Sequence, residues 1–184
     1  MSIKYLESKD IHVINDFLNE HDNQFITEYF HGEDVKWCYG HRSSPGQTTR
    51  WFDCNLSDNP FFTEYLQTKI NEVTNCKWSV RQVYANGQTV MLDGGWHKDI
   101  MACDRNTNTE NYWTALLYVS DITPDNIDII NGHTEIKING KIQSIEPYKN
   151  RLVLFKSNLM HRGRAPSVPS MFRISVAWKL KKID

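Results

Sequence analysis

Two residues in the stretch GGWHKDI, His97 and Asp99, are of types that bind metal ions and stand two positions apart. In an extended segment, residues i and i+2 project to the same side, so this imidazole and this carboxylate can share one ion. A His-x-Asp pair arises too often by chance to carry weight alone. The pair is therefore half of a candidate metal site, and a third ligand has to come from elsewhere in the chain.

Two later histidines, His133 and His161, could supply the third ligand. His161 opens HRGRAP after the apolar run RLVLF, whereas His133 begins a strand beside an Asn-Gly turn, where we expect it to be solvated. His161 is therefore the stronger candidate. Two imidazoles and one carboxylate leave three adjacent positions of an octahedron open, which is the arrangement used for non-haem Fe(II).

The run FRISVAWKL (172–180) near the end of the chain places its large apolar residues on one face of a strand. The other face carries Arg173 with two small neighbours, Ser175 and Ala177. If that face lies inside the protein, Arg173 is a buried cation with no obvious protein carboxylate to pair with. A dianionic co-substrate would satisfy it through a bidentate pair. The alternative is an edge strand with Arg173 in water.

The elements that must position these residues fall into two regions. In the first, we expect a helix capped by Asp10, with apolar residues at helical spacing through Ile11, Ile14, Leu18 and Phe25. A second helix is predicted from Asn59 as cap and Pro60 at the first helical position, with Phe62, Leu66, Ile70 and Val73 on one face. Between them, residues 29–55 are expected to form a loop with at most one short strand.

From residue 77 onward the pattern changes to short strands separated by turn signals. The expected strands are 78–85, 88–92, 112–120, 133–138, 141–147, 151–156, 159–165 and 172–180. Asn139-Gly140 is a strong signal for a two-residue hairpin turn. The expected fold is mainly β with N-terminal helices, a double-stranded β-helix or jelly roll, in one domain with residues 1–76 as helical support and 77–184 as core.

Composition excludes several classes of function. The chain has 184 residues and a formal charge of -1, which argues against a nucleic-acid partner. The sequence shows no secretory signal and no membrane-length apolar run, so we expect a cytoplasmic protein, in a host cytoplasm if a phage encodes it. The four cysteines lie far apart and are expected to be reduced. CYGH (38–41) has the spacing of half a zinc site, without a second half.

The ordered set His97-x-Asp99, His161 and Arg173-x-Ser175 resembles the Fe(II)- and 2-oxoglutarate-dependent dioxygenases, specifically their compact prolyl-4-hydroxylase-like branch. The likeness extends over about a hundred residues, from VYANGQT to FRISVAW (83–178). It includes Tyr84 before the metal motif, TALLYVSD (114–121), NGHTEI (131–136) and RLVLF before the distal histidine.

The resemblance implies a role for each matching residue. His97, Asp99 and His161 would ligate iron and form the catalytic centre. Arg173 would pair with the distal carboxylate of 2-oxoglutarate, assisted by Ser175 and by Tyr118. Tyr84 and Thr114 match positions that line the same pocket, although both tyrosines could be ordinary core aromatics. The implied cofactors are Fe(II), 2-oxoglutarate and O₂, with ascorbate as an optional reductant.

The implied activity is oxidative decarboxylation of 2-oxoglutarate coupled to hydroxylation of a substrate C–H bond. By family analogy a peptidyl proline is the first candidate substrate, a free amino acid or small metabolite the second and an alkylated nucleobase the third. The glycine pair at 94–95, and Arg173 where many prolyl hydroxylases have lysine, leave prolyl specificity open. Residues 100–112 are expected to form either a substrate lid or a plain surface connection. The alternative to an enzyme is a cupin-like module that binds a metal or small anion.

Overall fold

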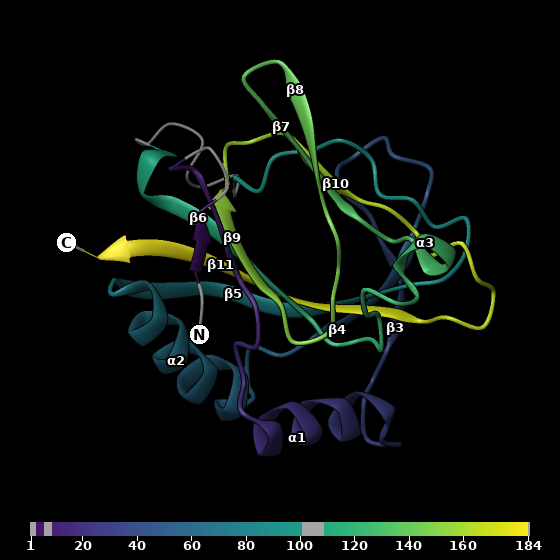
Figure 1. The fold of residues 1–184 in the computed structure, drawn as a ribbon, viewed down its shortest axis with the longest axis horizontal. Coiled ribbons are helices and arrows are strands. Elements are labelled where there is room, and N and C mark those ends of the chain that lie inside the picture. The colour runs from purple at the N-terminus through teal and green to yellow at the C-terminus, as the bar shows by residue number, and fades with distance from the viewer. Residues whose placement is uncertain (1–2, 6–8, 101–108, 184) are drawn as a thin grey trace.

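The computed structural model describes residues 3–5, 9–100 and 109–183 and contains a large and a small antiparallel sheet (Figure 1). The large sheet consists, in spatial order, of β1 (Ile3–Tyr5), β2 (Ile11–Ile14), β9 (Leu152–Lys156), β6 (Tyr112–Tyr118), β11 (Arg173–Ile183), β5 (Lys77–Gln88), β4 (Trp51–Asn55) and β3 (Cys38–His41). The small sheet consists of β10 (His161–Gly163), β7 (Thr134–Ile138) and β8 (Lys141–Ile145). This is a jelly-roll core, as the sequence predicts.

Helices cover one face of the large sheet (Figure 1). They are α1 (Glu20–His31) and α2 (Leu66–Thr74), the latter preceded by a π-helical turn, η1 (Phe61–Tyr65). The buried side chains of Phe30, Phe62 and Leu66 pack there against Trp178 of β11. The Trp178 indole also donates to the Phe62 carbonyl oxygen at 2.9 Å, which ties the helical layer to the sheet.

The small sheet lies on the opposite side of the large sheet, and a second core fills the space between them (Figure 1). Ile136 of β7 and Ile145 of β8 pack there with Leu116 of β6 and Phe155 of β9. Two further short helices, η3 (Thr109–Asn111) and α3 (Ile127–Ile130), flank β6 along the chain. The inward faces of β5, β6 and β11 therefore look toward the small sheet, and the candidate site lies on that side.

The helix predicted from Asp10 is wrong. Residues Ile11–Ile14 form β2 and pair with β9, and α1 begins only at Glu20 with Asn19 as its cap. The side chain of Asn19 accepts a hydrogen bond from the Asp22 N–H at 2.8 Å. A short apolar run such as IHVI fits a buried strand as well as a helix, and pairing with the distant β9 decides between them.

Most of the other predicted elements are confirmed within a few residues. The Asn59 side chain caps the second helical segment at Phe61 N–H, and Asn139 and Gly140 both have positive φ, at 49° and 75°. The strand predicted at 88–92 is wrong, because β5 continues to Gln88 and a turn follows, with Met91 exposed at φ 68°. The expected loop at 29–55 contains two strands, β3 and β4, so the first 76 residues contribute strands as well as helices.

The thiols of Cys38, Cys54 and Cys76 are free, as expected, and Cys103 lies outside the described residues. Within the described ranges, no helix is both long and apolar enough to cross a membrane.

Candidate metal centre and cavity

Two extended segments from distant parts of the chain bring the predicted metal ligands together. Residues 94–99 run beside residues 157–163, and their backbones are joined at both ends. The Gly94 N–H donates to the Gly163 carbonyl at 2.8 Å, and the Asp99 N–H donates to the Ser157 carbonyl at 2.9 Å. Between these bonds, His97 and His161 form an isolated antiparallel bridge. The pairing of these two segments thus places His97 and Asp99 next to His161.

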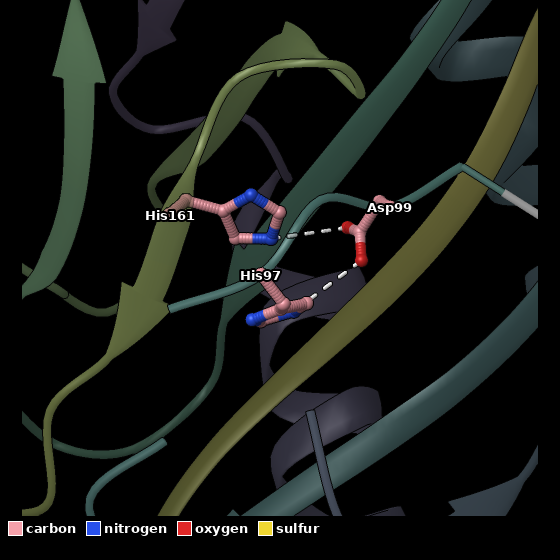
Figure 2. A group of neighbouring side chains, drawn as sticks. All are labelled: His97, Asp99 and His161. Carbon is pink, nitrogen blue, oxygen red and sulfur yellow. Dashed lines mark ion pairs between the residues drawn. The ribbon is translucent and has the colours of Figure 1, made fainter. Parts of the chain in front are cut away.

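The three side chains converge on one point (Figure 2). Each offers one ligand atom, and these atoms all lie within 4.8 Å of one another. The Nε2 atom of His97 is 3.4 Å from Asp99 Oδ1, and the Nε2 atom of His161 is 3.2 Å from Asp99 Oδ2. The side chains of Asp99 and His161 are 7% and 6% exposed, so the site is shielded from water. The geometry brings the three predicted ligands together.

The hydrogen bonds of the two imidazoles leave their inward nitrogens available to a metal. The Nδ1 atom of His97 lies 2.9 Å from the Gly95 carbonyl oxygen, and that of His161 lies 2.9 Å from the Leu159 carbonyl oxygen. A carbonyl can only accept, so Nδ1 carries the proton and Nε2 of each neutral ring carries a lone pair. Burial lowers the pKa of His161, which favours that neutral form. Two lone pairs facing a carboxylate form a donor set that fits a divalent transition metal.

Two groups on strands of the large sheet hold Asp99 ionised. Its Oδ2 accepts a hydrogen bond from Thr114 Oγ1 at 2.8 Å and contacts the ammonium group of Lys179. Burial alone would raise the pKa of Asp99, but the charge of Lys179 holds that pKa well below its ordinary value. Asp99 is therefore a carboxylate whenever the protein is folded near neutral pH.

Arg173 is buried, at 2% exposure, and its hydrogen bonds go to neutral groups. The Nε–H donates to the Gly132 carbonyl at 2.6 Å, and the two terminal nitrogens donate to Gln88 Oε1 at 2.9 Å and Thr134 Oγ1 at 3.2 Å. Within the described ranges, these bonds account for three of its five N–H groups and leave one on each terminal nitrogen. The predicted buried cation without a protein carboxylate is thus present.

One cavity contacts both the metal-ligand group and Arg173. Ser175 and Tyr84, two of the residues predicted to bind the co-substrate, line this cavity. Tyr118 lies beside it, with its hydroxyl donating to Thr134 Oγ1 at 2.8 Å and its ring centroid 5.4 Å from the Arg173 guanidinium carbon. Thr114 is placed differently, because its hydroxyl contacts Asp99 and Ser157 rather than the Arg173 end.

Several residues of the cavity are absent from the sequence-based prediction. Gln88 and Thr134 hold Arg173, and Lys179 contacts Asp99. The cavity lining also includes His41, whose ring is tilted by 53° against that of Trp51, with centroids 5.4 Å apart. Strand alternation could have identified Lys179, which is six positions after Arg173 on the same face, and Gln88, which shares a face with Tyr84.

Other features of the sequence are placed as follows. Arg162 pairs with Glu135 at 2.7 Å, and Arg164 pairs with Asp93 at 3.3 Å, so both arginines after His161 have protein partners. His41 of the CYGH motif contributes to the cavity wall. The expected lid at 100–112 falls mostly on residues 101–108, which lie outside the described residues.

Neither a protein-family model nor a curated protein sequence matches this chain. Solved structures do match it. A prolyl hydroxylase from Trichoplax adhaerens, in complex with a peptide fragment of the hypoxia inducible factor oxygen degradation domain, has a TM-score of 0.69 and 16% identity. The match covers 95% of this chain and 84% of the hydroxylase.

Two further matches extend the comparison. A Pseudomonas putida prolyl-4-hydroxylase matches with a TM-score of 0.59 and 14% identity over 95% of this chain and 94% of its own. HygX from Streptomyces hygroscopicus, with nickel and 2-oxoglutarate bound, matches with a TM-score of 0.61 and 13% identity. The match covers 94% of this chain and 82% of HygX. The chain therefore has the fold of the 2-oxoglutarate-dependent Fe(II) oxygenases, including those that hydroxylate proline.

Proposed function

We propose that this protein is an Fe(II)- and 2-oxoglutarate-dependent oxygenase that hydroxylates a substrate C–H bond. The observation that carries the proposal is a single cavity that contacts two buried, complementary features. One is the group of His97, Asp99 and His161, and the other is the guanidinium of Arg173, which has no carboxylate partner in the described part of the chain. A keto acid with a second carboxylate is the ligand that both features can hold together.

The chain's own residues account for binding and orientation. His97, Asp99 and His161 would hold Fe(II) on one side and leave three adjacent positions open. Arg173 would present its two remaining N–H groups to the distal carboxylate as a bidentate pair. Bound Fe(II), with 2-oxoglutarate and O₂, would supply the oxidising chemistry that converts a substrate C–H bond to an alcohol and releases succinate and CO₂.

For the substrate, we propose a peptide side chain, with proline as the first candidate. Both hydroxylases compared above act on proline by their names, and one is bound to a peptide. A small metabolite is the alternative, because HygX is also known with hygromycin B bound. The cavity wall offers the rings of His41 and Trp51 and the buried hydroxyl of Ser43, which has no hydrogen-bond partner among the described residues.

The proposal is tested by measuring succinate formed from 2-oxoglutarate with Fe(II) and O₂. Slow turnover without the true substrate is expected in the wild type and should stop when iron is chelated. Arg173→Ala should raise the 2-oxoglutarate concentration needed for half-maximal turnover by about 30-fold or more, because a charged pair to the carboxylate is lost, while Fe(II) affinity is retained. Retained metal binding without any succinate would instead favour a cupin-like binding module.

Candidate substrates can then be sought by incubating the protein with the peptides and metabolites of a cell lysate. A compound whose mass increases by one oxygen atom with the wild type, but not with Asp99→Ala, identifies the substrate class. If only proline-containing peptides gain an oxygen atom, the result supports prolyl hydroxylation. If only small metabolites gain one, the result contradicts it.

A further inference from the structure

Lys179 is a buried cation placed directly behind a candidate metal ligand. It lies on the inward face of β11, which it shares with Arg173, and pairs across the strand register with Thr114 of β6. Only 8% of the residue is exposed, and its ammonium contacts Asp99 Oδ2 and hydrogen-bonds to Tyr84. Burying an ammonium group is unfavourable unless it is paired, so a packing role alone does not explain a lysine at this position.

The two carboxylate oxygens of Asp99 have different contacts. Oδ2 receives the ammonium of Lys179 and the hydroxyl of Thr114, both from strands of the large sheet, and it also lies 3.2 Å from His161 Nε2. Oδ1 lies 3.4 Å from His97 Nε2, and no hydroxyl or ammonium donor reaches it among the contacts of the described residues. An oxygen that already accepts two strong donors has little capacity left for a metal ion, whereas Oδ1 retains its lone pairs.

This difference matters because a carboxylate can bind a metal through one oxygen or through both. In a site with two histidines and one carboxylate, three positions remain open only if the carboxylate uses one oxygen. Two oxygens would close one of the positions needed by a chelating keto acid and O₂. Free rotation of Asp99 about its side-chain bonds would permit either mode.

We propose that Lys179, with Thr114 as a second donor, is a positioning residue that restricts Asp99 to single-oxygen coordination through Oδ1. The inference rests on the proposed function, because it assumes a site that binds a divalent metal and then 2-oxoglutarate. It adds a residue of the same cavity that acts on the metal and on 2-oxoglutarate through Asp99. Its removal therefore affects co-substrate binding more than metal binding.

The test uses Co(II), whose visible absorption reports coordination number, and calorimetric titration of 2-oxoglutarate into the Co(II)-loaded protein. Lys179→Met keeps the length of the side chain and removes its charge. We expect this variant to bind Co(II) at least as tightly as the wild type, with an altered spectrum, and to bind 2-oxoglutarate at least about tenfold more weakly. Lys179→Arg, which retains a cationic donor, should restore most of the 2-oxoglutarate affinity.

Thr114→Val removes only the weaker donor and should change 2-oxoglutarate affinity in the same direction by a smaller factor. If Lys179→Met does not fold, Thr114→Val decides the question by the same two measurements. A wild-type spectrum and wild-type 2-oxoglutarate affinity in the variant would overturn the inference. Equal losses of Co(II) and 2-oxoglutarate binding would also overturn it, because they would show a merely structural role.

Measurements on the wild-type protein distinguish a failure of this inference from a failure of the proposed function on which it rests. Wild-type protein that binds Co(II) but not 2-oxoglutarate would overturn the proposed function itself. Wild-type protein that binds both, beside a Lys179→Met variant that behaves identically, would overturn only the role of Lys179.

Discussion

His97 and His161 donate backbone hydrogen bonds to each other's carbonyl groups, at 3.0 Å and 2.9 Å. The two imidazoles therefore start from directly opposed residues, and their ring centroids lie 4.3 Å apart. The spacing of the two nitrogen ligands depends on this pair of bonds rather than on loop conformation. Such a ladder holds the ligands in place before any ion arrives.

Replacing His161 with alanine should remove one of three metal ligands. We expect Fe(II) affinity, measured anaerobically by calorimetry, to fall by at least about 100-fold, since loss of outer-shell partners alone costs 10–100-fold. His133→Ala is the matched control, because this histidine precedes β7 and is not part of the ligand group. Wild-type affinity in His161→Ala would contradict the metal assignment.

Gly132→Ala should weaken 2-oxoglutarate binding without touching the metal ligands. Gly132 has φ 90°, and an added Cβ would lie 2.9 Å from Arg173 Cδ. Gly140→Ala is a matched control, with φ 75° and nothing within 4 Å of an added Cβ. Both variants should lose about 1–2 kcal/mol of stability from left-handed strain. Only Gly132→Ala should also show a loss of about tenfold in 2-oxoglutarate affinity by calorimetry. An equal affinity in the two variants would argue against Gly132 as a support of Arg173.

Trp178→Ala should destabilise the fold by about 3–5 kcal/mol, because this fully buried indole packs between β11 and the helical layer. Trp178→Phe should cost less, since it loses mainly the hydrogen bond to the Phe62 carbonyl. The exposed Ile183 on the same strand provides the control, and Ile183→Ala should change stability by less than about 0.5 kcal/mol. Urea unfolding measures all three, and similar losses for Trp178→Ala and Ile183→Ala would contradict this packing.

Asp22→Asn should lower stability in a pH-dependent way. Burial opposes ionisation of Asp22, but the Tyr65 hydroxyl at 2.9 Å and the Lys69 ammonium at 3.2 Å outweigh it and lower its pKa below the ordinary 3.8. A lowered folded-state pKa gives stability that is present above about pH 4 and is lost as pH falls through the folded-state pKa. The variant should therefore be about 1–3 kcal/mol less stable at pH 7, with a difference that shrinks toward pH 2.

Glu28→Gln on the same helix is the control for Asp22, since its side chain is exposed and bonds only to Gln24 among the described residues. Thermal unfolding from pH 2 to pH 8 compares the two variants with the wild type. A difference between Asp22→Asn and the wild type that stays constant with pH would show that ionisation of Asp22 does not stabilise the fold.

The sequence predicted that His97 and Asp99 lie on one side because strand alternation is local information. In an extended chain, His97 and Asp99 share a side whatever they pair with, and Arg173 and Ser175 do so in the same way. The same rule reaches Lys179, which continues the inward face beyond Ala177. The inward face named from the sequence ends at Ala177, and Lys179, which contacts Asp99, is the next residue on that face.

Other features depend on long-range pairing and could not be predicted from local pattern. The run at Ile11–Ile14 becomes a strand because it pairs with β9, more than a hundred residues away. Likewise, Gly132 and Thr134 support Arg173 only because the folded jelly roll brings the small sheet against β11. Pattern in one segment carries no information about which distant segment will lie beside it.

Arg173 and Lys179 stand on one face of a continuous strand, with only the small residues Ser175 and Ala177 between them on that face. Strand β11 therefore fixes their separation at six residues, a span of about 20 Å. Inserting or deleting a single residue between them would reverse the facing of one relative to the other and send a charged group into the apolar layer beneath the helices. The strand thus tolerates exchange of its side chains more readily than any change in its length, and homologous proteins that keep both charges should keep this interval.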